Sequence, residues 1–202
     1  MAARGRTIAL CVLAAACARR PLRPTGPAVA TVAGPVRVVV LPFRAATDDG
    51  TLPPDAAMRA AHLLARHLAE AGIAVVEPGT VARAIADGYD ASRASRIASD
   101  VGASVAAVGT LSRYDERQGT AWAATMPASV AYEVGLVRTE DGAVIARDRF
   151  EQTQQALSDN VLALPSFVQA GGRWRTREEM LDDALARTAR RLATAIAPPP
   201  PR

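Results

Sequence analysis

The sequence of 202 residues contains no lysine, only two cysteines and two histidines, and few aromatic residues, which make up 4% of the chain. Cys11 and Cys17 both lie near the N-terminus, so a domain that begins after them has no disulfide, no thiolate nucleophile and no sulfur ligand. His62 and His67 lie five residues apart, about 140° around a helix, whereas zinc sites on helices use i and i+4 spacing. We therefore expect a domain held together by packing, with no metal and no cofactor.

Recognisable catalytic motifs are also lacking. The sequence has no Gly-x-Ser-x-Gly, no phosphate-binding loop and no Gly-x-Gly-x-x-Gly. Asp48 and Asp49 form an acidic pair after the first expected strand, but no histidine or second carboxylate cluster accompanies them. A polar turn is the favoured interpretation of this pair. The sequence predicts a protein that is not an enzyme, with an enzyme of unrecognised mechanism as one alternative.

The positive net charge does not belong to the central part of the chain. All 24 basic residues are arginine, and the formal net charge is +4. Only 18 arginines lie within residues 36–197, together with all 20 acidic residues, so this region carries −2. The six arginines outside it are Arg4, Arg6, Arg19, Arg20, Arg23 and Arg202. A nucleic-acid interface needs a clustered basic face, so we expect no nucleic-acid partner.

The N-terminus has the pattern of an export signal. Two arginines lie within the first six residues, and residues 7–16 (TIALCVLAAA) are apolar. This run is too short for a permanent membrane helix, which needs about 20 residues. A charged start, a short apolar stretch and small residues before a cleavage point are typical of a secretory signal peptide, here residues 1–16.

Cys17 is the expected lipidation site. The segment 13–17 (LAAAC) resembles the bacterial lipobox, although the leucine stands one position early. The alternative is ordinary cleavage at an Ala-x-Ala site. With lipidation, palmitate and the other acyl chains on Cys17 anchor the protein to the membrane. Ala18 follows where aspartate would retain the protein at the inner membrane, which favours the inner leaflet of the outer membrane, facing the periplasm.

The remaining chain divides into a linker, one domain and a tail. Residues 17–35 contain the cysteine and a tether rich in proline, glycine and small residues, and 198–202 form a proline-rich tail. Within the domain of 36–197 we expect strands at 36–43, 73–77, 104–114, 128–138 and 143–152. Helices are expected at 54–71, 80–87, 91–101 and from 176 onward, where Thr176 and Glu179 have capping-box spacing. The order β-α-β-α-α-β-β-β-α predicts an α/β fold with a single mixed sheet of about five strands and helices packed against it.

This order carries a resemblance to a family of bacterial envelope proteins. The segments VVVLPF, AGIAVVEP, DVGASVAAVGTLSRY and SVAYEVGLVRTEDGAVIARDRF follow one another along the chain. Together they resemble the α/β envelope proteins that include LpoB, CsgG and the N-terminal domain of TolB. The resemblance implies docking or assembly in the cell envelope and gives no catalytic residues. The tether is short for an LpoB-like reach across the periplasm, and the charged hairpin 128–152 is unsuited to a CsgG-like membrane barrel.

Two segments are candidates for binding. Arg173, Trp174 and Arg175 follow a glycine pair and precede the last helix, and helix N-termini attract anions. Trp122 lies in the polar loop 115–126, which we expect to be flexible. Core packing of each tryptophan is the structural alternative. The leading hypothesis is docking on an unknown envelope protein through 115–126, 156–175 or both. The second is a binding module for an anionic glycan or lipid headgroup, and the oligomeric state is left open.

Overall fold

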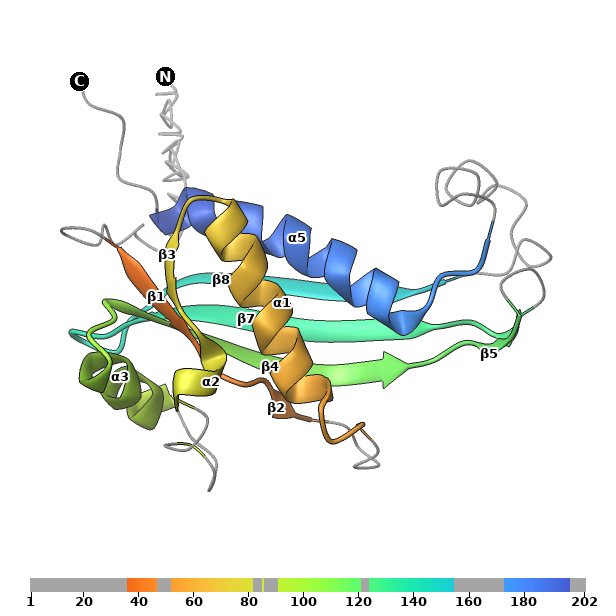
Figure 1. Ribbon diagram of the computed structural model, residues 1–202, viewed down its shortest axis with the longest axis horizontal. Coiled ribbons are helices and arrows are strands. Elements are labelled where there is room, and N and C mark those ends of the chain that lie inside the picture. Colours follow the sequence, from red (N-terminus) through yellow and green to blue (C-terminus); the bar gives the residue numbers. More distant parts are fainter. Residues whose placement is uncertain are drawn as a thin grey trace, which may run out of the picture.

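The computed structural model describes residues 36–46, 52–81, 85, 91–120, 124–154 and 173–196. They form a main mixed sheet with helices on both faces and a separate two-stranded sheet. The strands follow the order β3-β1-β4-β7-β8 (Figure 1). β1 is parallel to β3 and β4, whereas β4, β7 and β8 form an antiparallel meander. The predicted α/β class and five-stranded mixed sheet are confirmed.

The described elements match the predicted order. The main strands are β1 (Arg37–Val40), β3 (Ala74–Val76), β4 (Val105–Asp115), β7 (Ser129–Arg138) and β8 (Val144–Thr153). The helices are α1 (Ala56–Glu70), α2 (Pro78–Val81), α3 (Ala91–Asp100) and α5 (Arg177–Ile196). None of these described helices is long and apolar enough to cross a bilayer.

Two loop predictions need correction. The polar loop expected at 45–51 begins within a short strand, β2 (Arg44–Ala45). β2 pairs with β4 because the chain continues beside that strand after β1. The expected flexible loop 115–126 contains the short pair β5 (Gln118–Gly119) and β6 (Ala124–Met126). Gly119 has φ of 103° there, a backbone conformation that glycine adopts without the steric cost of a Cβ.

The helix predicted over 80–87 also differs in the structure. α2 begins two residues earlier, at Pro78, because proline suits the first turn of a helix, where its missing N–H needs no partner. The predicted boundaries at 16/17 and 197/198, the tether and the segment 156–172 lie outside the described residues.

β1 lies between β3 and β4 and is buried on both faces, as its run of β-branched residues predicts. Val38 and Val40 pack with α1 and α5 in the larger core, while Val39 and Leu41 pack toward α3 on the opposite face. The predicted inward residues of α5 are all buried: Leu181, Leu185, Leu192 and Ile196. The alternation of β1 therefore separates two cores of unequal size.

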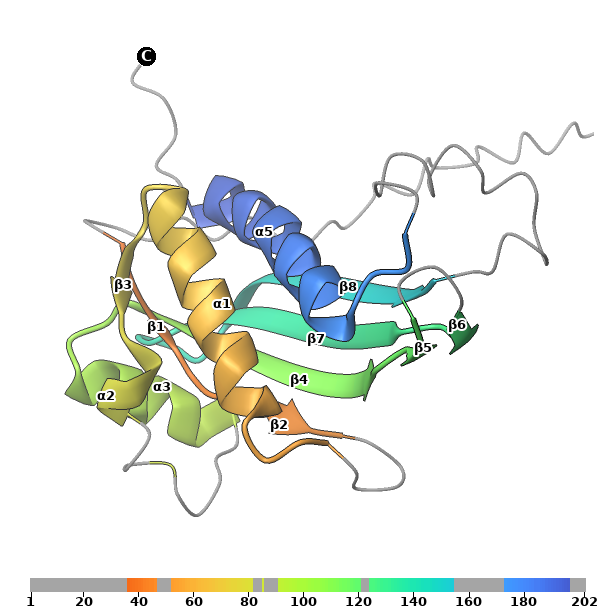
Figure 2. The same cartoon turned by 45° about the vertical axis from the view of Figure 1, so that its right-hand side comes forward.

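The two faces of the sheet are covered to different extents. α1 and α5 lie side by side across one face (Figures 1 and 2). On the other face, α2 and α3 contribute to a smaller core against β1, β3 and the adjoining ends of β4 and β7. Farther along β4, β7 and β8, exposed polar side chains occupy this second face, among them Ser112, Glu133, Arg147 and Arg149. The fold thus leaves one half of one sheet face without a covering helix among the described residues.

Candidate docking surface

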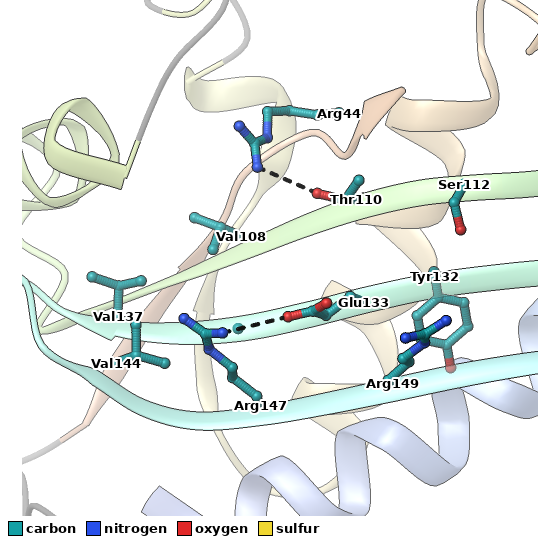
Figure 3. Close-up of a pocket in the computed structure, with 11 residues that line it drawn as sticks. Arg44, Val108, Thr110, Ser112, Tyr132, Glu133, Val137, Val144, Arg147 and Arg149 are labelled. Atoms are coloured by element: carbon teal, nitrogen blue, oxygen red, sulfur yellow. Dashed lines mark hydrogen bonds and ion pairs between the residues drawn. The ribbon is translucent and has the colours of Figure 1, made fainter. Parts of the chain in front are cut away.

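A groove of about 410 Å³ lies on this uncovered half of the sheet (Figure 3). Val108, Gly135 and Val137 contribute to its floor from β4 and β7. Arg44 of β2 lies on one side, and Arg147 and Arg149 of β8 lie on the other. We call this feature, with its floor and its three arginines, the sheet groove.

Strand alternation explains why the sheet groove is polar at its rim. In β7, Tyr132 and Val134 face the helices, so Glu133 between them faces the groove. The register places Arg149 opposite Glu133 and Arg147 opposite Gly135. Cross-strand partners have side chains on the same face, so β8 directs two arginines toward the groove.

The arginines of the sheet groove are only loosely held. Arg147 lies 3.8 Å from Glu133, and their side chains are 67% and 51% exposed. Arg44 donates a long hydrogen bond of 3.4 Å to the Thr110 hydroxyl, and Arg149 lies 3.2 Å from Glu151. Exposed ion pairs of this kind contribute at most about 1 kcal/mol, so a stronger anionic partner can replace them.

Gly135 has no side chain to fill the sheet groove above β7. A Cβ at this position would meet the Val108 side chain at 3.6 Å, which is ordinary van der Waals contact, and no backbone strain forbids it. A side chain at this position would therefore begin in the groove, with room for its Cβ. The glycine preserves space in the groove rather than an unusual backbone conformation.

The predicted binding residues Arg173, Trp174 and Arg175 lie just before α5. Trp174 is 7% exposed and belongs to the buried set. Arg173 donates two hydrogen bonds to Glu179, and Arg175 bonds the Glu179 carbonyl at 2.6 Å and pairs with Asp183. The two guanidinium groups are thus engaged by carboxylates of the same chain, and binding of an external anion there stays a prediction.

The start of α5 is fixed by a capping box, as the sequence predicts. The Glu179 N–H donates to the Thr176 hydroxyl at 3.2 Å, and the Thr176 N–H donates to Glu179 Oε2 at 3.0 Å. Hydrogen bonds from Arg173 and from the Thr176 backbone lower the pKa of Glu179 from 4.5 to about 2. This carboxylate therefore holds both the helix end and the segment that leads into it.

We expect Glu179→Gln to reduce the acid sensitivity of the fold. Because the folded-state pKa is depressed, the stabilisation by Glu179 is complete above pH 4.5 and is lost as the pH falls toward 2. Its side chain is 36% exposed, so solvent screening limits the effect to about 1 kcal/mol or less. Urea unfolding at pH 7 and pH 3 measures the change. If the free energy of unfolding falls by the same amount between pH 7 and pH 3 in the wild type and the variant, Glu179 is not a source of the acid sensitivity.

The other predicted site residues lie elsewhere. Cys17 and Trp122 are outside the described residues, so lipidation and a contact role for Trp122 stay predictions. Four residues after Trp122 in the sequence, Met126 of β6 is 54% exposed. This places an apolar side chain on the surface at the same end of the sheet as the beginning of α5 (Figure 2).

Neither histidine contributes to a metal cluster in the described part of the chain. His67 lies between Glu70 and Asp182, with both nitrogen–oxygen distances at 2.7 Å. His62 points to Glu77 at 3.8 Å. No group of three or more potential metal ligands occurs among the described residues. The His67 contacts tie α1 to α5 and have no access to the sheet groove on the opposite face.

Sequence reasoning missed a buried polar network beneath the meander. The hydroxyl of Tyr132 lies 2.9 Å from that of Thr188 on α5, which donates in turn to Asp148 of β8. Arg191 completes the network with hydrogen bonds to Asp148 at 3.1 and 2.6 Å. Burial raises the pKa of Asp148, but the hydrogen bonds from Arg191 and Thr188 outweigh it, so this pKa lies below its usual range. The network fixes α5 against the strands that carry the sheet groove.

Comparisons with known proteins agree with this architecture. PelC from Paraburkholderia phytofirmans, described as a dodecamer, is similar in structure, with a TM-score of 0.52 and 14% identity over 80% of this chain and 89% of that chain. Lipoprotein GNA1162 from Neisseria meningitidis has a TM-score of 0.46 and 17% identity, covering 67% and 93% of the two chains. The LpoB C-terminal domain from Salmonella enterica has a TM-score of 0.43 and 20% identity, covering 61% and 86%.

These likenesses concern the fold. The resemblance predicted from the order of the elements is confirmed at the level of the fold. No protein-family model and no curated protein matches the sequence. At these identities, function has to be argued from the surface of this chain.

Proposed function

We propose that this protein is a cell-envelope lipoprotein that acts without catalysis, as a docking or assembly factor. The observation that carries the proposal is the sheet groove on an otherwise packed α/β domain. Proteins bury the apolar floor of a sheet unless another surface uses it. Here the half-buried Val108 and the exposed Val144 lie among exposed arginines, an arrangement suited to a partner surface.

The chemistry of the sheet groove supports binding rather than reaction. Its described lining contains three arginines, three residues with a hydroxyl group and one carboxylate, and it has no histidine or cysteine. A general acid–base or nucleophilic site needs an activated group next to a base. The one carboxylate, Glu133, lies 3.8 Å from Arg147, and the described hydrogen bonds of Thr110 and Ser112 involve Arg44 and the Ala131 carbonyl instead. The groove offers hydrogen-bond donors and positive charge instead.

The membrane anchor is the second part of the proposal. Lipidation of Cys17 would hold the domain by a tether of residues 18–35, which reaches at most about 60 Å when fully extended. The proposed place is the inner leaflet of the outer membrane, facing the periplasm. The short tether favours a partner close to the membrane surface.

Self-assembly is a further element of the proposal. PelC, which shares the fold at a TM-score of 0.52, is described as a dodecamer. We propose that copies of this chain also associate, with the uncovered sheet half free for a different protein. Light scattering of the detergent-purified chain would report the mass of the assembly, and a monomer at micromolar concentration would contradict self-assembly.

The anchor is tested by radiolabelled palmitate incorporation into the wild type and Cys17→Ala, followed by separation of inner and outer membranes. The expected result is a labelled wild-type protein in the outer membrane and an unlabelled variant. Cys11→Ala is the matched control and should keep the label. Unlabelled wild-type protein in the soluble periplasmic fraction would contradict the lipoprotein, and labelled protein in the inner membrane would contradict the proposed location.

A further inference from the structure

The sheet groove has a charge that differs from that of its surroundings. Three arginines and one glutamate line it, whereas residues 36–197 as a whole carry −2. Attraction of an anionic partner to this domain would therefore be local to the groove. We propose that the sheet groove binds an extended, acidic segment of a partner protein. This inference rests on the proposed docking function and names its surface and partner chemistry.

The dimensions fit one extended polypeptide. Arg44 on β2 and Arg147 on β8 flank β4 and β7, so three strand spacings of about 4.8 Å, roughly 14 Å in all, separate the two flanking strands. From Glu133 to Val137 the floor runs along five residues of β7, roughly 13 Å. An extended chain of four to five residues occupies that length.

The lining suits alternating acidic and aliphatic side chains. Val108, which is half-buried, and Val144, which is 41% exposed, provide aliphatic contacts. Arg147 and Arg149 provide bidentate donors for carboxylates. The one aromatic residue of the described lining, Tyr132, is 1% exposed, so it offers no ring face for stacking a nucleic-acid base. These features favour a polypeptide.

A direct test measures fluorescence anisotropy of a labelled ten-residue peptide of alternating glutamate and valine with the full chain purified in mild detergent. The variant Arg147→Gln/Arg149→Gln is expected to weaken binding at least about tenfold, because two charge-assisted contacts are lost. The control Arg66→Gln/Arg190→Gln removes the same charge from the two helices on the opposite face and is expected to stay within about twofold. A peptide with glutamine in place of glutamate should bind about as weakly as the groove variant binds the acidic peptide.

Gly135→Val separates occupancy of the sheet groove from charge. Its Cβ would lie at an ordinary 3.6 Å from the Val108 side chain, so we expect the variant to fold and to lose about tenfold in peptide affinity. Circular dichroism and urea unfolding verify that each variant is folded.

Several results would overturn the inference. Equal weakening by the Arg66/Arg190 control would show that bulk charge attracts the peptide. Wild-type affinity in Gly135→Val, or no binding by the wild type, would show that the groove is not its site. Tighter, groove-dependent binding of heparin or of phosphatidylglycerol vesicles would assign the surface to a glycan or a membrane. Each of these results leaves the palmitate test of the anchor unaffected, so the two proposals fail separately.

Discussion

Replacing Gly109 with alanine is expected to lower the free energy of unfolding by about 1–3 kcal/mol, the usual cost of overpacking a core. A Cβ on Gly109 would lie 2.6 Å from three atoms of the Phe43 ring. Phe43 is 4% exposed and packs edge-on against Tyr132, with ring centroids 6.3 Å apart. The ring therefore has little room to move away. Urea unfolding measures the loss.

The matched control is Gly135→Ala on the neighbouring strand. Gly135 lies opposite Val108, one residue along from Gly109, and its Cβ would meet only ordinary contacts. We expect no loss of stability there, and a gain of up to about 1 kcal/mol because a strand glycine is replaced. In a Phe43→Ala background, Gly109→Ala should cost clearly less than in the wild type. Equal costs in both backgrounds would show that the ring contact is not the cause.

Alkaline pH is expected to destabilise the fold through Tyr132. Burial raises the pKa of Tyr132 from 10.0 to about 12. The folded-state pKa is higher than the unfolded-state value. The contribution of the protonated Tyr132 side chain to the free energy of unfolding is therefore complete below pH 10 and is lost as the pH rises through 12. At pH 11.5 the expected loss from this side chain is about 2 kcal/mol relative to pH 9. Urea unfolding at the two pH values measures it.

Tyr132→Phe isolates this contribution. At pH 9 the variant loses a hydrogen bond to Thr188 worth about 1 kcal/mol, although the Thr188 hydroxyl keeps Asp148 as a partner. Its stability should then fall by about 2 kcal/mol less than that of the wild type between pH 9 and 11.5. Burial also raises the pKa of Tyr114, so Tyr114→Phe serves as the comparison. An unchanged alkaline loss in Tyr132→Phe would assign the effect to other groups.

Local sequence patterns predict most of this fold. The run of β-branched residues at 36–43 indicates a strand buried on both faces, and Val38, Val39 and Val40 are fully buried. Gly142, at φ of 69°, supports the predicted hairpin between β7 and β8. The spacing of Thr176 and Glu179 predicts the capping box that starts α5. Each of these signals lies within a few neighbouring residues.

The candidate site depends on contacts that no local pattern contains. Arg44 reaches the sheet groove because β2 pairs with β4, 66 residues away along the chain. Thr188 looks like an ordinary polar position of a helix until Tyr132 and Asp148 are placed beneath it. β8 contains three successive charged residues, Arg147, Asp148 and Arg149, so its sequence does not show which of them face the groove. Which part of this sheet face stays uncovered depends on where α2 and α3 end.

The arginines before α5 also show that a local sequence pattern does not reveal the partners of a side chain. Arginine, tryptophan and a helix N-terminus suggest an anion site, but the partners of Arg173 and Arg175 are Glu179 and Asp183 of the following helix. Those carboxylates face the arginines because one turn of helix returns them to the same side. Arginines that lack strong partners are found instead on β8, in the sheet groove.

The most direct test of the docking account is site-specific photo-crosslinking in cells. A photoreactive residue in place of Ser112, which is exposed in the sheet groove, is compared with one in place of Arg190, which is exposed on the opposite face. The account predicts one discrete heterologous adduct from position 112, lost when Gly135→Val is added, and none from position 190. No adduct from position 112, or the same adduct from both positions, would contradict docking through the uncovered half of the sheet.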